Sequence, residues 1–492
     1  MANDVKSTHV SIAHRLKSAA RRRFPDQYAG MQRVVYPVLG ELRTLRRAGL
    51  KLVAQRLVRR RQWEIMLPIQ RTSRVRLSEV WAGDAPLELA SWIDALTTAS
   101  GRTATYLSPS RWRASELADL ARGYPASAGL RIARKPGGIG SPTLTFDEAG
   151  TKLQDRLWST HREQILVYNY FFGRGIGPRL FDLLELEDGS GQLWPAYVVE
   201  HVPGRTPSMT ECRDLVGRIA RELEVGPVRL TSWIWKGLDH VDFQCPDCNG
   251  NVIHDDARSR TVYVDMGHFV PDRYDRFVER VALSSVDDTH FGYTTALLGG
   301  KYLYQRVPGV ALPARRDTRL RADSILSLLS REQVDPAGKV VFDVGCNLGL
   351  MSAYFLHAGA RWVHGWDLPP VVSRADEMLL ALGCTRFSLT GADLAKREDL
   401  LSDVPEHIRD TAREEGIVAF LSTRLQVGWP AALDRLPWRY LIYEGNEGEG
   451  VAATIRHIAD FAAPRGNIRT AEMRTYTDGM TGERTLALLE RT

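Results

Sequence analysis

From about residue 128 onward, the spacing of apolar and polar positions predicts strands and helices in a clear order. A strand ending in a Gly turn is followed by a long helical pattern, two further strands, more helices and another strand. These elements are expected, in order, over 129–138, 146–172, 173–189, 194–204, 210–224 and 261–269. Residues 75–130 mix helical and extended patterns and cannot be ordered in the same way.

A second block of pattern begins at residue 340. Residues 340–372 read as a buried strand, a Gly-rich turn, a helix and a second strand that ends at Asp367. Further strands are expected over 385–394, 416–426 and 438–450. Buried strands that alternate with helices predict an α/β sheet of Rossmann type.

Composition agrees with a chain of two or three globular domains. The 492 residues are 44% hydrophobic and 25% charged, and no apolar run approaches the roughly 18 residues that a membrane span needs. The first residues lack the apolar core of a signal peptide, and five scattered cysteines do not form a disulfide scaffold. We therefore expect a cytoplasmic protein.

Positive charge is concentrated at the start of the chain. Residues 1–65 hold fifteen Lys or Arg against four acids, and within 38–61 leucines at helical spacing alternate with arginines. This helix could rest on anionic membrane at the inner face of the cytoplasmic membrane, or dock on a partner such as a glycosyltransferase. A solvated helix packed on its own domain explains the pattern equally well. Nucleic acid is disfavoured because no aromatic residues are interleaved with the charges.

Three short motifs follow one another between residues 240 and 267: His240-Val241-Asp242, Asn251-Val252-Ile253 and Asp265-Met266-Gly267. With the order of elements around them, they resemble the protein-kinase-like fold of bacterial lipopolysaccharide and aminoglycoside phosphotransferases. The resemblance covers about residues 125–285. It implies a bilobal α+β domain that transfers phosphate from ATP with Mg²⁺.

The resemblance also assigns roles to individual residues. Asp242 becomes the base that accepts the proton of the acceptor hydroxyl, and Asn251 and Asp265 become the magnesium ligands. Backbone groups around Glu200 and Val202 become the hinge that meets adenine. Lys135, on a strand, would pair with Glu163 on the following helix.

The sequence departs from that family in three places. The interval from Asp242 to Asn251 is nine residues, where the family pattern has about five, and no Gly-rich loop precedes Lys135. The distance along the chain from Lys135 to Glu163 is also long. The alternative that this region is a pseudokinase, which only supports the rest of the chain, therefore stays open. Asn249 is the candidate to replace Asn251 as a magnesium ligand. Cys245 and Cys248 in the insertion have the spacing of zinc ligands, but two free thiols explain them as well, since no second such pair exists.

The turn after the strand at 340–344 contains Asp343-x-Gly345-x-Asn347-x-Gly349. This pattern resembles motif I of the class I S-adenosylmethionine (SAM) methyltransferases. The resemblance covers about residues 320–492, and implies that Asp367 binds the ribose hydroxyls and Asp393 the adenine amine. A structural βαβ unit and an NAD site are the alternatives.

Four segments result: a basic helical segment (1–75), a protein-kinase-like domain (76–288), a lead-in (289–335) and a methyltransferase domain (336–492). In content the chain resembles the kinase–methyltransferases that terminate bacterial O-antigen chains, which implies a glycan or lipid-linked glycan acceptor. A soluble enzyme that modifies antibiotics or other natural products is the alternative.

The methyl acceptor can be a hydroxyl or a phosphate, and the two need different side chains. A hydroxyl needs a base, for which Glu444 and Glu447 are the candidates. A phosphate is already anionic and needs cations. Arginines near the expected acceptor favour phosphate, made first by the kinase: Arg315, Arg316, Arg319, Arg321 and Arg424.

Overall fold

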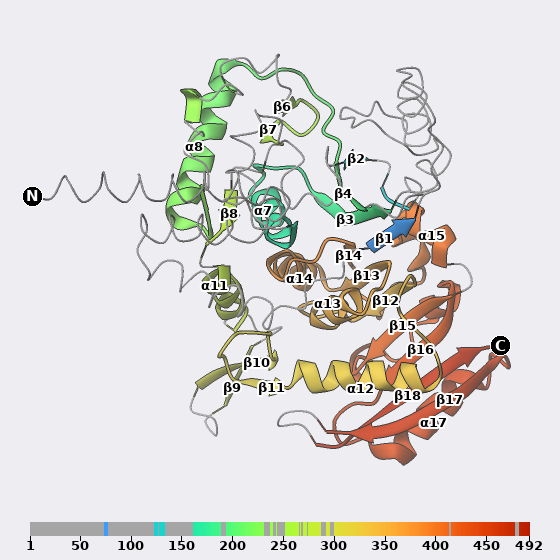
Figure 1. The fold of residues 1–492 in the computed structure, drawn as a ribbon. Helices are drawn as coiled ribbons and strands as arrows, with labels where there is room; N and C mark the ends of the chain where they lie inside the picture. Colours follow the sequence, from blue (N-terminus) through green and yellow to red (C-terminus); the bar gives the residue numbers. More distant parts are fainter. Residues whose placement is uncertain are drawn as a thin grey trace, which may run out of the picture. The chain divides into compact units, whose positions relative to one another are not determined.

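A computed structural model of the chain is shown in Figure 1. It describes residues 73–76, 123–125, 127–132, 161–187, 193–230, 237–239, 243, 251–264, 266, 269–272, 274–286, 292–295, 300–412, 415–477 and 482–492. Several predicted features lie outside the described residues: the basic segment 1–65, Lys135, Asp242, Cys245, Cys248, Asn249 and Asp265. For Glu163 the helix is described, but not the side chain.

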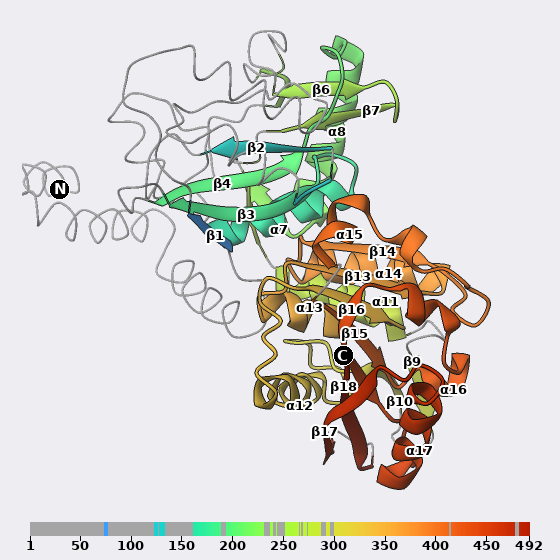
Figure 2. The same cartoon turned by 90° about the vertical axis from the view of Figure 1, so that its right-hand side faces the viewer.

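Seven strands form the main sheet of the C-terminal half (Figures 1 and 2). Their spatial order is β14 (Phe387–Gly391), β13 (Trp362–Asp367), β12 (Val340–Val344), β15 (Gly416–Leu421), β16 (Trp438–Glu444), β18 (Arg484–Arg491) and β17 (Ile468–Tyr476). The first five are parallel, whereas β18 runs antiparallel to both of its neighbours. The predicted Rossmann-like α/β domain is confirmed.

The order in which the chain adds strands to this sheet reverses at β12. Strands β13 and β14 lie on one side of β12, and β15 and β16 lie on the other. Both β12 and β15 are buried at every position, as expected of central parallel strands whose two faces are covered. The covering helices include α12 (Thr318–Arg331), α13 (Leu350–His357), α14 (Pro369–Ala381) and α17 (Gly450–Ala462). In a doubly wound sheet the ligand binds at the carboxyl ends of the strands beside such a reversal.

The lead-in is more than a linker. It contains β9 (Gly292–Thr295), β10 (Gly300–Gln305) and β11 (Ala314–Arg316), which form a small sheet before α12 begins. Asp317 caps α12 by accepting from the backbone N–H groups of Arg319 and Leu320.

The described part before residue 289 is built around a four-stranded sheet in the order β1, β3, β4, β2. Its strands are β1 (Ser73–Arg76), β2 (Ala128–Ile132), β3 (Leu180–Glu187) and β4 (Leu193–Glu200). Because β1 pairs with β3, residues 73–76 belong to this sheet, and the predicted boundary at residue 75 falls inside β1. The domain bounds stay a prediction. The sheet must begin by Ser73.

Helices and short strands complete this part of the chain. The helices are α7 (His161–Gly173), α8 (Met209–Val225) and α11 (Tyr274–Val286). The strands are β5 (Val228–Leu230), β6 (Val252–Asp255), β7 (Arg260–Tyr263) and β8 (Phe269–Pro271). The kinase-like assignment of this region stays a prediction.

The regions before and after residue 289 share contacts and a core. The buried Asn169 side chain on α7 donates to the carbonyls of Leu380 and Cys384, at 3.1 and 2.8 Å. Phe181 and Leu184 belong to the same apolar cluster as the strands of the seven-stranded sheet. Within the described residues, no helix has the length and apolar content to span a membrane.

Candidate functional site

The turn between β12 and α13 adopts a left-handed backbone at three positions. Gly345, Asn347 and Gly349 have φ of 85°, 51° and 72°. The N–H groups of Gly345 and Cys346 donate to the carbonyl of Trp366 on β13, which fixes the turn to the neighbouring strand. Gly349 begins α13 without a side-chain cap, so the N-terminus of this helix is suited to an anionic group.

Gly345 and Gly349 also lie too close to neighbouring side chains to carry a side chain of their own. A Cβ on Gly345 would lie 2.4 Å from Oγ1 of Thr423, the second residue after β15. A Cβ on Gly349 would lie 2.9 Å from Leu379 on α14. The motif residues are therefore required by packing as well as by backbone conformation.

Asp367 lies at the carboxyl end of β13 and is bonded to the turn. Its Oδ2 accepts from the backbone N–H of Asn347 at 2.8 Å, and its Oδ1 accepts from Leu368 at 2.8 Å. Leu368 itself is 40% exposed, which is unusual for a leucine beside a buried strand. A partly exposed carboxylate next to an exposed apolar side chain suits a ribose and the base attached to it.

Asp343 differs from Asp367 in being buried, with its Oδ2 accepting from the Ser352 hydroxyl at 2.5 Å. Burial raises the pKa of Asp343 to about 6, although the hydrogen bond from Ser352 opposes the shift. Asp343 thus supports the turn from below and does not present an open carboxylate to a ligand.

Asp393 follows β14 in an exposed loop. Its side chain pairs with Lys396 at 2.8 Å, and the hydrogen bond from Lys396 lowers the pKa of Asp393. The preceding residue, Ala392, donates its N–H to the carbonyl of Asp367 at 2.7 Å. The structure therefore brings the predicted SAM-site residues together at the carboxyl ends of β12, β13 and β14.

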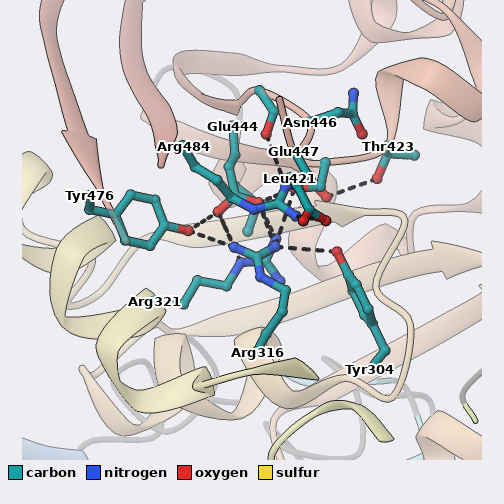
Figure 3. Close-up of polar contacts among 12 residues, drawn as sticks. Tyr304, Arg316, Arg321, Leu421, Thr423, Glu444, Asn446, Glu447, Tyr476 and Arg484 are labelled. Atoms are coloured by element: carbon teal, nitrogen blue, oxygen red, sulfur yellow. Dashed lines mark hydrogen bonds and ion pairs between the residues drawn. The ribbon is translucent and has the colours of Figure 1, made fainter. Parts of the chain in front are cut away.

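Glu444, at the end of β16, is the centre of a buried ionic network (Figure 3). Arg316 donates to both of its carboxylate oxygens, at 2.8 and 2.9 Å, and Arg321 does so at 2.6 and 3.1 Å. Burial favours a raised pKa, but the charges of Arg316 and Arg321 outweigh it and hold the pKa of Glu444 well below its usual range. A carboxylate so stabilised is a poor proton acceptor, which argues against Glu444 as the base; its predicted role stays a prediction.

The arginines that we predicted to bind phosphate are all paired with carboxylates. Arg316 and Arg321 both bind Glu444. The remaining pairs are Arg315 with Glu447, Arg319 with Asp323, and Arg424 with Glu449. A phosphate would have to compete with these carboxylates, so the predicted cationic cradle is not supported.

The sequence analysis missed Ser422 and Tyr476, which complete the network. The hydroxyl groups of both bond to Glu444, and Arg316 donates to the Tyr476 hydroxyl at 2.7 Å. Ser422 has φ of 57°, which is rare for a residue other than glycine. The only signal in the sequence was its place directly after a buried strand.

In the region that we predict to be kinase-like, Asn251 is the one proposed magnesium ligand among the described residues. At the open end of the hairpin of β6 and β7, the N–H of Val264 donates to the carbonyl of Asn251 at 2.9 Å. Asn251 therefore lies beside the residue that precedes Asp265 in the sequence. The Glu200 side chain accepts from Arg258 and Arg260, each at 2.6 Å, and Val202 packs in a small core with Val262 and Val264. Among the described residues, no cluster of acids, His or Cys is suited to a metal ion.

No protein-family model and no curated protein matches this chain. Solved structures that resemble it include magnesium protoporphyrin IX methyltransferase from Synechocystis PCC 6803 with bound SAM, at 17% identity and a TM-score of 0.27. That likeness covers 36% of this chain and 80% of the other. A SAM-dependent methyltransferase from Aquifex aeolicus is similar at 18% identity and a TM-score of 0.26, over 35% of this chain and 90% of the other. Likenesses this weak do not identify a reaction, which must be inferred from the site.

Proposed function

We propose that the C-terminal domain, together with the lead-in, is a SAM-dependent methyltransferase. The observation that carries this proposal is the hydrogen bond from the backbone N–H of Asn347 to the Asp367 carboxylate. It lies at the carboxyl ends of the parallel strands, beside the point where the strand order reverses. Asp367 would accept from the ribose hydroxyls, Leu368 would cover one face of adenine, and Asp393 would meet its amine. The N-terminus of α13 would bind the carboxylate of the methionine moiety.

When bound, SAM supplies a methyl group on a positively charged sulfur, which a nucleophile can attack without a metal. The protein has to bind and orient the two partners. The buried Asp343 keeps the turn in place from beneath, because its carboxyl accepts from Ser352 on α13.

Calorimetry on the full chain tests this function against the NAD alternative. We expect SAM and its demethylated product to bind and NAD not to bind. Binding of NAD with no binding of SAM would assign the domain to a dehydrogenase-like class instead.

A phosphotransferase is a second candidate function, for the region before residue 289. It is favoured by the pairing of Asn251, a predicted magnesium ligand, with Val264, which directly precedes the other predicted ligand, Asp265, in the sequence. We expect Mg²⁺-dependent consumption of ATP that Asp265→Asn abolishes without affecting SAM binding. ATP that binds without turnover would instead favour the pseudokinase alternative.

We further propose a glycan acceptor for the paired activities, because the combination resembles O-antigen chain-terminating enzymes. Labelled ATP and labelled SAM, supplied together with candidate glycans, test this directly. Label transfer to an aminoglycoside-like small molecule and not to glycans would favour the natural-product alternative.

A further inference from the structure

Ser422 occupies a backbone conformation that it would not adopt by itself. It follows β15 directly and has φ of 57°, in the left-handed region that costs a non-glycine residue about 1–2 kcal/mol. A residue stays in such a conformation only where its surroundings hold it there. Here the holding groups are visible.

Bonds from both the backbone and the side chain of Ser422 hold it. Its N–H donates to the carbonyl of Glu444 at 3.1 Å, and its hydroxyl donates to the Glu444 carboxylate. Arg484, at the start of β18, donates to the same hydroxyl at 3.0 Å, and Arg316 lies 3.3 Å from it. The left-handed turn after β15 is therefore tied to the ionic network.

The residue that follows Ser422 reaches the turn of the predicted cofactor site. Thr423 Oγ1 bonds the carbonyls of Leu421 at 3.1 Å and Val344 at 3.4 Å. Val344 is the last residue of β12, directly before Gly345, and Thr423 occupies the space where a Gly345 side chain would lie. The conformation of Ser422 thus decides whether Thr423 packs against the turn.

The same network reaches the lead-in. Glu444 binds Arg316 at the end of β11 and Arg321 on α12 (Figure 3). It also accepts from the Ser422 hydroxyl. One buried carboxylate therefore joins the lead-in, the end of β15 and the end of β16.

We propose that Ser422 is a positioning residue for SAM: Glu444 holds it in the left-handed conformation, and it thereby seats Thr423 against the Gly345 turn. The inference rests on the proposed methyltransferase function. It concerns the shape of the turn, since Ser422 acts on SAM through Thr423. It also gives Glu444 a role that needs no proton transfer.

Two substitutions at the same residue separate conformation from the hydroxyl group. Ser422→Ala removes the hydroxyl anchor and keeps the side chain that disfavours positive φ. Ser422→Gly also removes the hydroxyl, but glycine adopts positive φ freely. We expect calorimetry with SAM to give a Kd at least fivefold weaker for Ser422→Ala, and within twofold of wild type for Ser422→Gly.

Ser259 offers a matched control, because it is also a serine at positive φ, 49°, in the turn between β6 and β7. Ser259→Ala and Ser259→Gly should both leave SAM affinity unchanged. Wild-type affinity in Ser422→Ala, or an equal loss in both Ser422 variants, would overturn the proposed role. Failure of the wild-type protein to bind SAM would instead count against the methyltransferase function.

Discussion

The backbone N–H of Asn347 donates to Oδ2 of Asp367 at 2.8 Å, across the end of two neighbouring strands. The acid that we predict to bind ribose therefore also holds the turn that we predict to bind the rest of SAM. Asn347 has positive φ, so its N–H points at the carboxylate only while the turn keeps its left-handed conformation. The two halves of the site are formed together.

Asp367→Ala should lower SAM affinity at least tenfold. The variant loses charge-assisted bonds to the ribose hydroxyls, of about 1.5–3 kcal/mol each, as well as the anchor of the turn. Calorimetry gives the affinity, and circular dichroism shows that the fold is intact. Glu415→Ala is the control, because Glu415 lies directly before β15, at the amino ends of the parallel strands and away from Asp367. This substitution removes the ion pair between Glu415 and Lys339. Equal SAM affinity in both variants would mean that the cofactor site has been misplaced.

Gly345→Ala should destabilise the protein by about 2–4 kcal/mol. Alanine would have to adopt the φ of 85° that this turn requires, and its Cβ would lie 2.4 Å from Oγ1 of Thr423. Gly338→Ala is a close match, because Gly338 has φ of 76° but no atom within 4 Å of the added Cβ. It should cost only about 1 kcal/mol. Urea unfolding of both variants checks the difference, and equal losses would show that strain alone requires the glycine.

The titration of Asp343 should lower the free energy of unfolding as the pH rises from about 4 to 6. Its pKa is about 6 in the folded protein and near 3.8 when unfolded, so the folded state holds the extra proton in this window. Asp343→Asn cannot ionise, and its carbonyl can still accept from Ser352. The free energy of unfolding of Asp343→Asn, relative to that of wild type, should rise by about 2 kcal/mol between pH 4.5 and pH 7.5, as measured by urea unfolding. A constant difference across this range would show that Asp343 does not titrate there.

The strands and the SAM motif could be predicted from sequence because their signals are local. The alternation of buried strands with helices, and the spacing of Gly345, Asn347 and Gly349, are set within a few residues. Asp367 was found the same way, since it ends a strand.

The partners of Glu444 could not be predicted in this way. Arg316 and Arg321 lie more than a hundred residues before it in the chain, and only the fold brings them to the end of β16. From sequence they appeared as cations suited to phosphate, because a charged side chain shows its type but not its partner. Ser422 was missed for a related reason: its φ depends on those same distant bonds.

The last prediction concerns the contact between α7 and the C-terminal α/β domain. The buried Asn169 side chain donates to the carbonyl of Leu380, within the last turn of α14, and to that of Cys384, just beyond the helix. Asn169→Ala leaves the Cys384 carbonyl without this donor, which should cost about 1–3 kcal/mol of unfolding free energy.

Ser284→Ala is the control for that substitution, because the Ser284 hydroxyl on α11 accepts from Arg374 on α14 in an exposed bond of 3.1 Å. It should change stability by less than about 0.5 kcal/mol. If β3 and the seven-stranded sheet share one core, Asn169→Ala should also keep a single unfolding transition, seen alike by fluorescence and circular dichroism. Two separate transitions would show that the regions before and after residue 289 unfold independently, and that the shared contacts do not couple them.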